Sequence, residues 1–391
     1  MSTVVVTAAG IVSPLGRGLA ETTSSLLAGR DCVTPVTRFD VSRCKSSTAG
    51  QAPESLLDPA LNRKEQRLHP AARMMVAAVR ELREQDPGFA PTFCVIGTTS
   101  GGMSFGEAFF RSLSKTEGRP PRAAWLANYS PQKPVLDAME AAGFSSPSEI
   151  IANACASGTN AIGHAFSLIQ GGLCESVLCG GYDVISELVF AGFDSLQAST
   201  AEKCRPFDKD RTGLVLGEGA ALLALESLDS AQRRGAPVLA KVAGYGISTD
   251  NHHLTQPHPS GEGPYKAMSR ALASSGLDAS DIDYINAHGT ATPFNDATEG
   301  LAISRLFPGA RVSSTKAMMG HSLGAAGAIE AVFCILALQE QFLPPNIHFR
   351  APDPGWDMDI IANEAREGEL RCALSNSFGF GGTNASIILT T

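Results

Sequence analysis

Three side chains with reactive chemistry follow apolar segments of this sequence. Cys155 lies in IIANACASGTNAIGHAF, where an apolar strand leads into small residues and then into a helical pattern. His288 lies in YINAHGTATPFND and His321 ends the turn KAMMGH, and each also follows an apolar strand. A thiol is a nucleophile, and an imidazole can move a proton or donate a hydrogen bond, so the set has the groups needed for nucleophilic and acid–base catalysis. Ligands of α/β proteins bind at the carboxyl ends of the strands, where all three are expected.

Cys155 differs from the other cysteines in its surroundings. A thiol at a helix N-terminus is expected to have a lowered pKa, and backbone N–H groups there can stabilise an oxyanion. Its neighbours are Ala, Ser and Gly, which leave room for a substrate. Cys94, Cys179, Cys334 and Cys372 lie in apolar runs and fit buried structural cysteines.

A serine offers a competing interpretation. The stretch from Gly320 to Gly324, GHSLG, matches the G-x-S-x-G pattern of a hydrolase nucleophile, with Ser322 at its centre. Hydrolases of that kind place an acid and then a histidine later in the chain. The only histidine after Ser322 is His348, no Asp lies between them, and Glu330 and Glu340 fall in the next helical pattern. An esterase is therefore disfavoured.

Other motif classes are also disfavoured. The glycine-rich GFGGTN at 379–384 runs into a strand instead of opening a helix, and no G-x-x-x-x-G-K-[ST] phosphate loop is present. DNHHLTQPHP at 250–259 holds three histidines, but no shell of cysteines and carboxylates accompanies them, so no metal site is expected.

The composition restricts the class of protein and the cellular location that can be expected. With 391 residues, 43% of them apolar, and a net charge of −8, the chain reads as a globular protein without broad attraction to nucleic acid or anionic membrane. The apolar run AIEAVFCILAL has 11 residues and contains Glu330, which predicts a buried helix and no membrane span. Nine cysteines without C-x-x-C, and no signal-peptide pattern, predict free thiols and a cytoplasmic location.

The two halves of the chain resemble each other. Apolar strands alternate with helical patterns, which predicts an α/β layer structure with sheets buried on both faces. SEIIANACASGTNAIGHAFSLIQGG and ARVSSTKAMMGHSLGAAGAIEAVFCILAL are both a strand, a turn and a helix of small residues. LVLGEGAALLALE pairs with SFGFGGTNASIILTT, and FCVIGTTSGG with IDYINAHGTAT, in the same order. We predict an internal duplication with an N-terminal half at 1–238 and a C-terminal half at 239–391.

Together these motifs resemble the elongating β-ketoacyl-acyl-carrier-protein synthases, a branch of the thiolase-like condensing enzymes. The resemblance rests on ACASG with Cys155, NAHGTATPFND with His288, KAMMGHSLGAAGA with Lys316 and His321, and NSFGFGGTN with Phe380. RPFDKDRTGLVLGEGA adds to it. The resemblance implies a five-layer αβαβα fold with internal duplication, and a homodimer or a ketosynthase heterodimer.

The resemblance also implies a reaction. An acyl chain moves from the phosphopantetheine of acyl carrier protein to Cys155, malonyl-carrier protein loses CO2, and the resulting enolate extends the acyl chain by two carbons. His288 and His321 would donate hydrogen bonds to the thioester oxygen, and Lys316 would keep the pocket cationic. No cofactor is expected on the enzyme itself, because the carrier brings the pantetheine arm.

The remaining roles come from the same resemblance. Glu299 and Asp296 would orient the catalytic set, and the N–H groups of Cys155 and Phe380 would form the oxyanion hole. Phe380 would also act as a gate. The residues expected at the pantetheine arm and the acyl pocket are Thr290, Thr292, His253, Thr255, Val189 and Phe193. The residues expected to dock the carrier protein are Arg63, Lys64 and Arg67.

Two other functions stay open at this point. A chain-length partner subunit of a heterodimer normally lacks the nucleophile, whereas Cys155 is present here. A thiolase or starter synthase using coenzyme A would carry a Cys-His-Asn or Cys-His-Cys set. The segment SFGEAFFRSLSKTEGRPPRAAWLANYS, at 104–130, resembles the family only loosely, so acyl length and pathway (fatty acid, polyketide or polyene) are not predicted.

Overall fold

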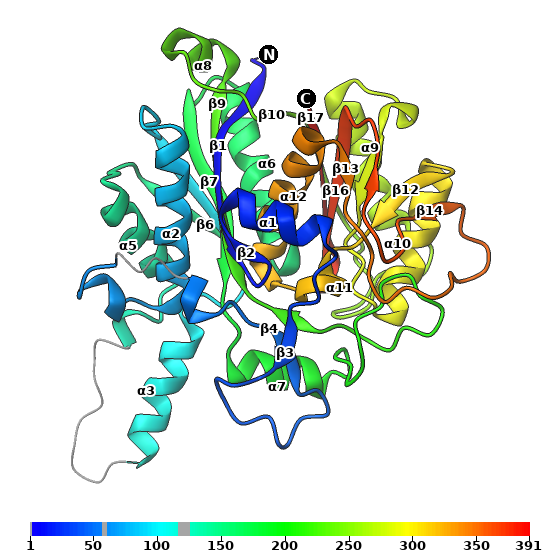
Figure 1. Ribbon diagram of the computed structural model, residues 1–391, viewed down its shortest axis with the longest axis horizontal. Coiled ribbons are helices and arrows are strands. Elements are labelled where there is room, and N and C mark those ends of the chain that lie inside the picture. Colours follow the sequence, from blue (N-terminus) through cyan, green and yellow to red (C-terminus); the bar gives the residue numbers. More distant parts are fainter. Residues whose placement is uncertain (1, 57–60, 116–125) are drawn as a thin grey trace.

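A continuous mixed sheet runs through the centre of the molecule. The computed structural model describes residues 2–56, 61–115 and 126–391. The sheet has 12 strands, and its order places strands of the N-terminal half on one side and strands of the C-terminal half on the other. Both termini lie at the same end of the molecule (Figure 1).

The strands of the N-terminal half are rich in Val, Ile, Leu and Ala and, apart from the half-buried outermost strand β6, are buried, as expected for strands covered on both faces. They are β1 (Val4–Ser13), β5 (Phe93–Gly97), β6 (Ser148–Ile151), β7 (Ser176–Asp183) and β9 (Gly219–Ser227). Outward from the centre their order is β1-β9-β7-β5-β6. Pairing is parallel between β5 and its two neighbours, and antiparallel elsewhere.

The C-terminal half repeats this arrangement. Its strands are β10 (Ala240–Thr249), β11 (Tyr284–Asn286), β12 (Ala310–Ser313), β14 (Met358–Ile360), β16 (Cys372–Gly379) and β17 (Thr383–Thr390). Outward from the centre the order is β10-β17-β16-β11-β12, followed by β14. Here β11 pairs in parallel with both neighbours, as β5 does in the first half. The first strands of the two halves, β1 and β10, pair antiparallel and join them.

Two helices of small and apolar residues fill the space between the halves. α6 (Ser157–Gln170) follows β6, and α12 (Ala326–Glu340) follows β12 in the equivalent place. They cross closely: a Cβ on Gly158 would lie 2.8 Å from the carbonyl oxygen of Gly324, and one on Gly327 would lie 2.6 Å from the backbone nitrogen of Thr159. Glycine is therefore required where the two helices meet.

Outer helices complete a five-layer arrangement. α2 (Pro70–Gln85) and α5 (Gln132–Ala142) cover the N-terminal strands, and α9 (Glu262–Ser275) and α10 (Pro293–Leu306) cover the C-terminal strands (Figure 1). The predicted fold class, a thiolase-like αβαβα body with internal duplication, is confirmed. The boundary between residues 238 and 239 stays a prediction.

Shorter elements lie around this body. The helices are α1 (Gly18–Leu27), α3 (Met103–Lys115), α7 (Glu187–Ser195), α8 (Leu228–Arg234) and α11 (Lys316–Met319). The strands are β2 (Gly16–Arg17), β3 (Val33–Pro35), β4 (Thr48–Gly50), β8 (Leu216–Gly217), β13 (Phe342–Leu343) and β15 (Arg366–Glu367). α3 projects from the body next to α7 (Figure 1).

One helical stretch has the length and hydropathy of a membrane span. It runs from Leu323 to Glu340, and 89% of it is buried inside the protein. It is the core helix α12 with the turn before it, as the sequence predicted from Glu330.

Candidate active site

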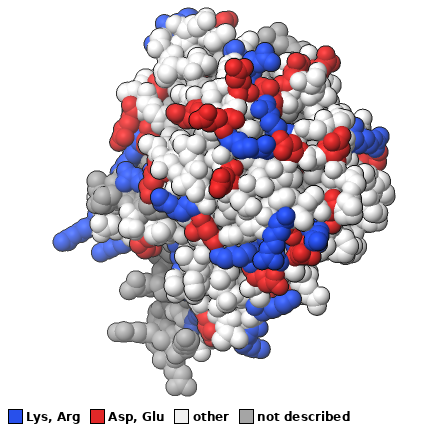
Figure 2. All heavy atoms as spheres, turned by 45° about the vertical axis from the view of Figure 1, so that its right-hand side comes forward, with Lys and Arg blue, Asp and Glu red and all other residues white. Residues whose placement is uncertain are grey.

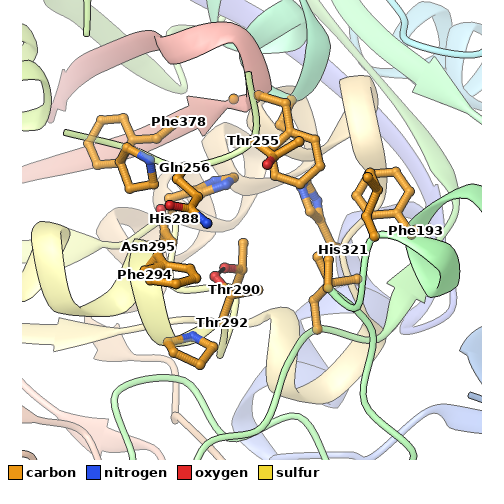
Figure 3. A pocket seen from close by; sticks show the side chains of 18 of the residues that line it. Phe193, Thr255, Gln256, His288, Thr290, Thr292, Phe294, Asn295, His321 and Phe378 are labelled. Carbon is orange, nitrogen blue, oxygen red and sulfur yellow. Dashed lines mark hydrogen bonds between the residues drawn. The ribbon is translucent and has the colours of Figure 1, made fainter. Parts of the chain in front are cut away.

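The three predicted reactive groups meet in one pocket. The sulfur of Cys155 and one ring nitrogen each of His288 and His321 all lie within 4.8 Å of one another. All three residues are buried and line the same cavity. Figure 3 shows the two imidazoles directed into this cavity, with Thr255 on one side and Thr290 on the other.

A short strained turn presents Cys155. β6 ends at Ile151, a 3₁₀ turn spans Ala154–Ala156, and α6 begins at Ser157. Ala154 has φ of 57°, in the left-handed region, where a residue with a side chain pays a steric cost. The small neighbours predicted from the sequence let this turn pack against the second half.

The predicted lowering of the Cys155 pKa is wrong for the unliganded site. Burial raises the pKa of this thiol to about 11, although Lys316 acts in the opposite direction. Cys155 precedes the helix instead of lying in its first turn, and desolvation of a thiolate outweighs a partial charge at a helix end. The unliganded site therefore holds a thiol.

Two backbone N–H groups face the sulfur. Those of Phe380 and of Cys155 itself both interact with the thiol and favour its charged form. Phe380 starts the turn Phe380–Gly382, in which Gly381 has φ of 82°, a conformation that favours glycine. The Phe380 ring stacks on Phe193 of α7, with centroids 5.5 Å apart and planes 20° apart.

The two imidazoles are close and uncharged. Their ring centroids are 5.2 Å apart and their planes are nearly perpendicular, at 85°. Burial, with Lys316 nearby, holds the pKa of His288 and of His321 well below the ordinary histidine value. Nδ1 of His288 and both ring nitrogens of His321 have no hydrogen-bond partner among the described residues. Each ring can thus offer an N–H or a lone pair to a bound molecule.

Two buried carboxylates fix the backbone around His288. Glu299 accepts hydrogen bonds from the backbone N–H groups of His288 and Gly289, each at 2.8 Å. Asp296 accepts from those of Phe207, at 2.8 Å, and Ala291, at 3.1 Å. Burial raises the pKa of Glu299 to about 7. Side-chain amides add to these contacts: Glu299 accepts from Asn376 at 3.1 Å, and Asp296 from Asn295 at 3.0 Å. Neither carboxylate has a hydrogen bond to the imidazole of His288 among the described residues, which fits positioning residues.

Lys316 lies behind the pocket. Its ammonium group pairs with the carboxylate of Glu330 on α12, and both side chains are buried. Burial raises the pKa of Glu330 to about 7, while Lys316 lowers it. Lys316 does not line the cavity, so it can influence the site through its charge and not by contact with a ligand in the pocket.

The residues predicted for the entrance and the acyl pocket fall into two groups. The cavity is lined by Thr290, Thr292, Thr255 and Phe193. The hydroxyl groups of Thr290 and Thr292 form a hydrogen bond, with their oxygens 2.9 Å apart. His253 does not line it: this exposed ring accepts a hydrogen bond from the backbone N–H of Thr255 at 3.2 Å. Val189 also lies outside the lining and packs with an apolar cluster that includes Phe190 and Leu216.

The residues predicted to dock a carrier protein are exposed. They lie just before α2, where Lys64 pairs with Glu140 at 2.6 Å, and Arg63 and Arg67 point to the surface. Figure 2 shows Lys and Arg interspersed with Asp and Glu on the face it presents.

The hydrolase interpretation of GHSLG fails on geometry. Ser322 is buried at 2% exposure, in the turn that precedes the helix, and its neighbour His321 points into the cysteine pocket. His348 pairs instead with Asp31, at 3.1 Å. No His–Ser pair forms at Ser322 among the described residues.

Sequence reasoning missed Asp183 at the end of β7. Its two oxygens accept hydrogen bonds from the hydroxyl groups of Thr98 and Ser100 and from the backbone N–H groups of Thr99, Ser100 and Gly324, at 2.6–2.9 Å. Gly324 follows His321 by three residues, so Asp183 ties the histidine turn of one half to the β5 loop of the other. A strand ending in GGYD gives no signal for this role, because the donors to Asp183 come from two segments far from it in the chain, residues 98–100 and Gly324.

Replacing Asp183 by asparagine should lower both stability and activity. The new amide must direct an NH2 group at N–H and O–H donors, and each unpaired buried group costs about 1–3 kcal/mol. We expect a lower melting temperature and a loss in kcat larger than any loss in KM, measured by calorimetry and steady-state condensation.

Glu81→Gln is a matched control for Asp183→Asn. Glu81 is a half-buried carboxylate outside the pocket lining, and it accepts hydrogen bonds from the backbone N–H groups of Ile11, at 3.0 Å, and Leu19, at 2.6 Å. This variant should lose stability with unchanged kinetics. Wild-type kcat in Asp183→Asn would contradict a positioning role for Asp183.

Comparisons with known proteins agree with this site. Residues 1–231 match the family described as beta-ketoacyl synthase, N-terminal domain, and residues 239–350 match its C-terminal domain. The 3-oxoacyl-[acyl-carrier-protein] synthase 2 of Staphylococcus aureus (strain COL) is 36% identical over 98% of this chain and 97% of its own.

Solved structures give the same result. The ishigamide ketosynthase/chain length factor has a TM-score of 0.92 and 34% identity, covering 100% of this chain and 99% of its own. A ketosynthase in complex with a type II polyketide acyl-carrier protein, AntDE:AntF, has a TM-score of 0.90 and 26% identity, with the same coverage. With the Cys-His-His pocket, these matches show that the chain belongs to the β-ketoacyl synthase family and is a β-ketoacyl-acyl-carrier-protein synthase.

Proposed function

We propose that Cys155 carries the growing acyl chain and that His288 and His321 activate malonyl-carrier protein beside it. One observation carries this assignment: a thiol and two uncharged imidazoles lie within 4.8 Å in a single pocket. A chain-length partner subunit without catalysis is not favoured, because the nucleophile and both imidazoles are present. A coenzyme A-dependent thiolase would need a different third residue.

The first half-reaction is acyl transfer to sulfur. The acyl carbonyl carbon forms a bond to Sγ of Cys155 and breaks its bond to the pantetheine sulfur, and the thiol proton leaves with the pantetheine thiol. One of the uncharged imidazoles has a ring nitrogen within 4.8 Å of the sulfur, so it can accept the thiol proton and pass it to the pantetheine sulfur. The N–H groups of Cys155 and Phe380 are suited to hold the tetrahedral oxyanion, since both already face the sulfur.

The second half-reaction is decarboxylation and condensation. The malonyl C–C bond breaks, CO2 leaves, and the electron pair becomes an enolate whose oxygen accepts N–H hydrogen bonds from His288 and His321. The enolate carbon then attacks the acyl carbon and breaks its bond to Cys155. The departing thiolate takes a proton from solvent, because loss of CO2 from a malonyl carboxylate supplies none. Uncharged imidazoles suit this role, because a neutral donor does not bind the malonyl carboxylate as an ion pair before CO2 leaves.

The Phe193–Phe380 stack is proposed as the boundary between the catalytic sulfur and the acyl chain. In the unliganded site the two rings lie parallel beside Cys155 and line the pocket together. An acyl chain on the sulfur would displace Phe380, which the glycines on both sides permit. Thr290, Thr292 and Thr255 are proposed to bind the pantetheine arm, and His253 to support Thr255 from outside.

Two partners are proposed. An acidic carrier protein would dock on Arg63, Lys64 and Arg67, because exposed guanidinium and ammonium groups steer an oppositely charged partner.

A second chain, identical or of the same family, would cover the apolar groove between α3 and α7. Its lining includes Phe110 and Leu188, which are 72% and 60% exposed. Exposure of large apolar side chains at this level is typical of a protein interface.

Reconstitution with carrier-bound substrates tests the function. The purified chain, with a panel of acyl-carrier proteins and malonyl-carrier protein, should release CO2 and form products two carbons longer. Intact-carrier mass spectrometry reads both the chain length and the acyl type accepted, and native mass spectrometry of the chain alone reads its dimeric state. Absence of any extended product across the panel would refute the proposed roles.

A charge-reversed chain serves as the control for carrier recognition. Arg63→Glu with Arg67→Glu should raise the KM for carrier-bound substrates and leave kcat unchanged, because these residues lie outside the pocket. Added salt should raise the wild-type KM in the same direction. An unchanged KM would exclude this docking surface without affecting the assignment of Cys155.

A further inference from the structure

The catalytic pocket also has the composition of a binding site for a soft divalent cation. Cys155, His288 and His321 form the only group of three or more His, Cys, Asp or Glu residues, among those the structure describes, that could surround one ion. A thiolate and two imidazoles are ligands that Zn2+ prefers, and three protein ligands with an open fourth position are typical of accessible zinc sites.

The spacing agrees with a tetrahedral ion. Zn–N bonds of about 2.0–2.1 Å and tetrahedral angles place the centroids of two coordinating imidazoles roughly 5 Å apart. The centroids of His288 and His321 are 5.2 Å apart. The donor atoms lie within 4.8 Å of one another, and a tetrahedral S/N/N set needs about 3.5 Å, so a shift of about 1 Å closes the site.

The ring nitrogens are free to coordinate. In buried sites, polar side-chain atoms normally have partners, and an exception needs a reason. Nδ1 of His288 and both ring nitrogens of His321 have none among the described residues, although both rings are at most 2% exposed. Their lone pairs do not have to be released from another contact before they bind an ion.

We propose that a thiophilic divalent cation such as Zn2+ binds Cys155, His288 and His321 as a reversible inhibitor that competes with acylation. On binding, the Cys155 S–H bond breaks, its electron pair forms the S–metal bond, and the proton goes to the buffer. No oxidation takes place. The pocket opening supplies the fourth position, which water can occupy.

This inference uses the same three side chains as the proposed function but not the chemistry assigned to them, so its test needs no substrate. Cd2+ is a suitable probe, because a Cd–thiolate bond has a charge-transfer absorption in the ultraviolet. Titration of the tag-free, reduced chain should develop this band with one equivalent per chain. The same equivalent should protect Cys155 from alkylation by iodoacetamide, as read by peptide mass spectrometry.

Variants locate the site. Cys155→Ser should abolish the band, and His288→Ala or His321→Ala should weaken binding on the order of tenfold or more, since loss of even an outer-shell partner costs 10–100-fold. Acylated chain should not bind, because the thioester sulfur carries no charge. Zn2+ should inhibit condensation of the free enzyme and lose its effect once Cys155 is acylated.

The neighbouring pair of exposed His252 and half-buried His258 is the matched competitor for the ion. Their rings are 4.8 Å apart, outside the catalytic pocket. A His252→Ala/His258→Ala chain should keep the one-equivalent band. The inference is overturned if no band forms, if the band survives in Cys155→Ser, or if the double variant at 252 and 258 removes it.

Discussion

Alanine in place of Cys155 abolishes chain extension and leaves decarboxylation of malonyl-carrier protein measurable. The variant has no sulfur to hold the acyl chain, so condensation should fall by a factor on the order of 10⁴ or more, as for loss of other covalent nucleophiles. The two imidazoles, which are proposed to stabilise the enolate, remain in place. Extended product is measured by mass spectrometry of the carrier, and CO2 release by a coupled assay.

Cys94→Ala is the matched control for this prediction. Cys94 is a buried cysteine of β5 that lies outside the pocket lining, so its variant should keep both reactions. Mass spectrometry after incubation with acyl-carrier protein should find an adduct on Cys155 in the wild-type chain. Extension at the wild-type rate by Cys155→Ala would reject the sulfur as the acyl carrier.

His321→Ala has the opposite pattern: it impairs decarboxylation while acyl transfer to Cys155 persists. Removal of one donor to a developing oxyanion typically costs 10²–10³-fold in kcat, and we expect a loss on this order for CO2 release. Because His288 and His321 would donate to the same oxygen, the double variant should lose less than the product of the two single losses. Acylation is read separately, by intact-protein mass spectrometry in a single turnover.

A surface histidine provides the comparison. His164 on α6 is 40% exposed and faces Glu149, so His164→Ala should leave CO2 release unchanged. Undiminished release of CO2 in His321→Ala would contradict the proposed role of that imidazole, even if condensation were lost.

Local patterns in the sequence were sufficient to predict most of the fold, because each buried strand is a short apolar run. β16 is the exception. Its centre, Ser375-Asn376-Ser377, reads as a polar loop, yet the strand is buried throughout its first seven residues. Two of these side chains have partners elsewhere in the fold: Asn376 donates to Glu299 at 3.1 Å, and the Ser377 and Thr159 hydroxyl groups lie 2.8 Å apart. A single sequence does not indicate such distant partners.

The central residues of the site were also predictable from the sequence, but their partners were not. Cys155, His288 and His321 were each predicted to follow a strand. Because β6 lies at one end of the sheet order and β11 and β12 lie near the other, the three side chains meet only through the packing of the two halves, in which the Cys155 turn contacts β16 and α12. The pKa of Cys155 was not predictable, because the depth of burial depends on how the second half covers the turn. Asp183 was missed as a site residue because it binds segments far away in the chain, at residues 98–100 and at Gly324. Glu330 was missed because it lies in an apolar run, although its partner Lys316 is only 14 residues away. Val189 and His253 lie outside the pocket lining because side-chain direction, and not proximity in sequence, decides it.

The contact between α6 and α12 limits how relatives of this protein can be recombined. A chimera that joins the first half of one homologue to the second half of another must bring together two helices whose backbones touch at Gly158 and Gly327. Alanine at either place would force the helices apart, and with them the turns that carry the sulfur and one imidazole. Shuffled synthases are thus expected to work only when both parents have glycine at this crossing, whatever their acyl pockets accept.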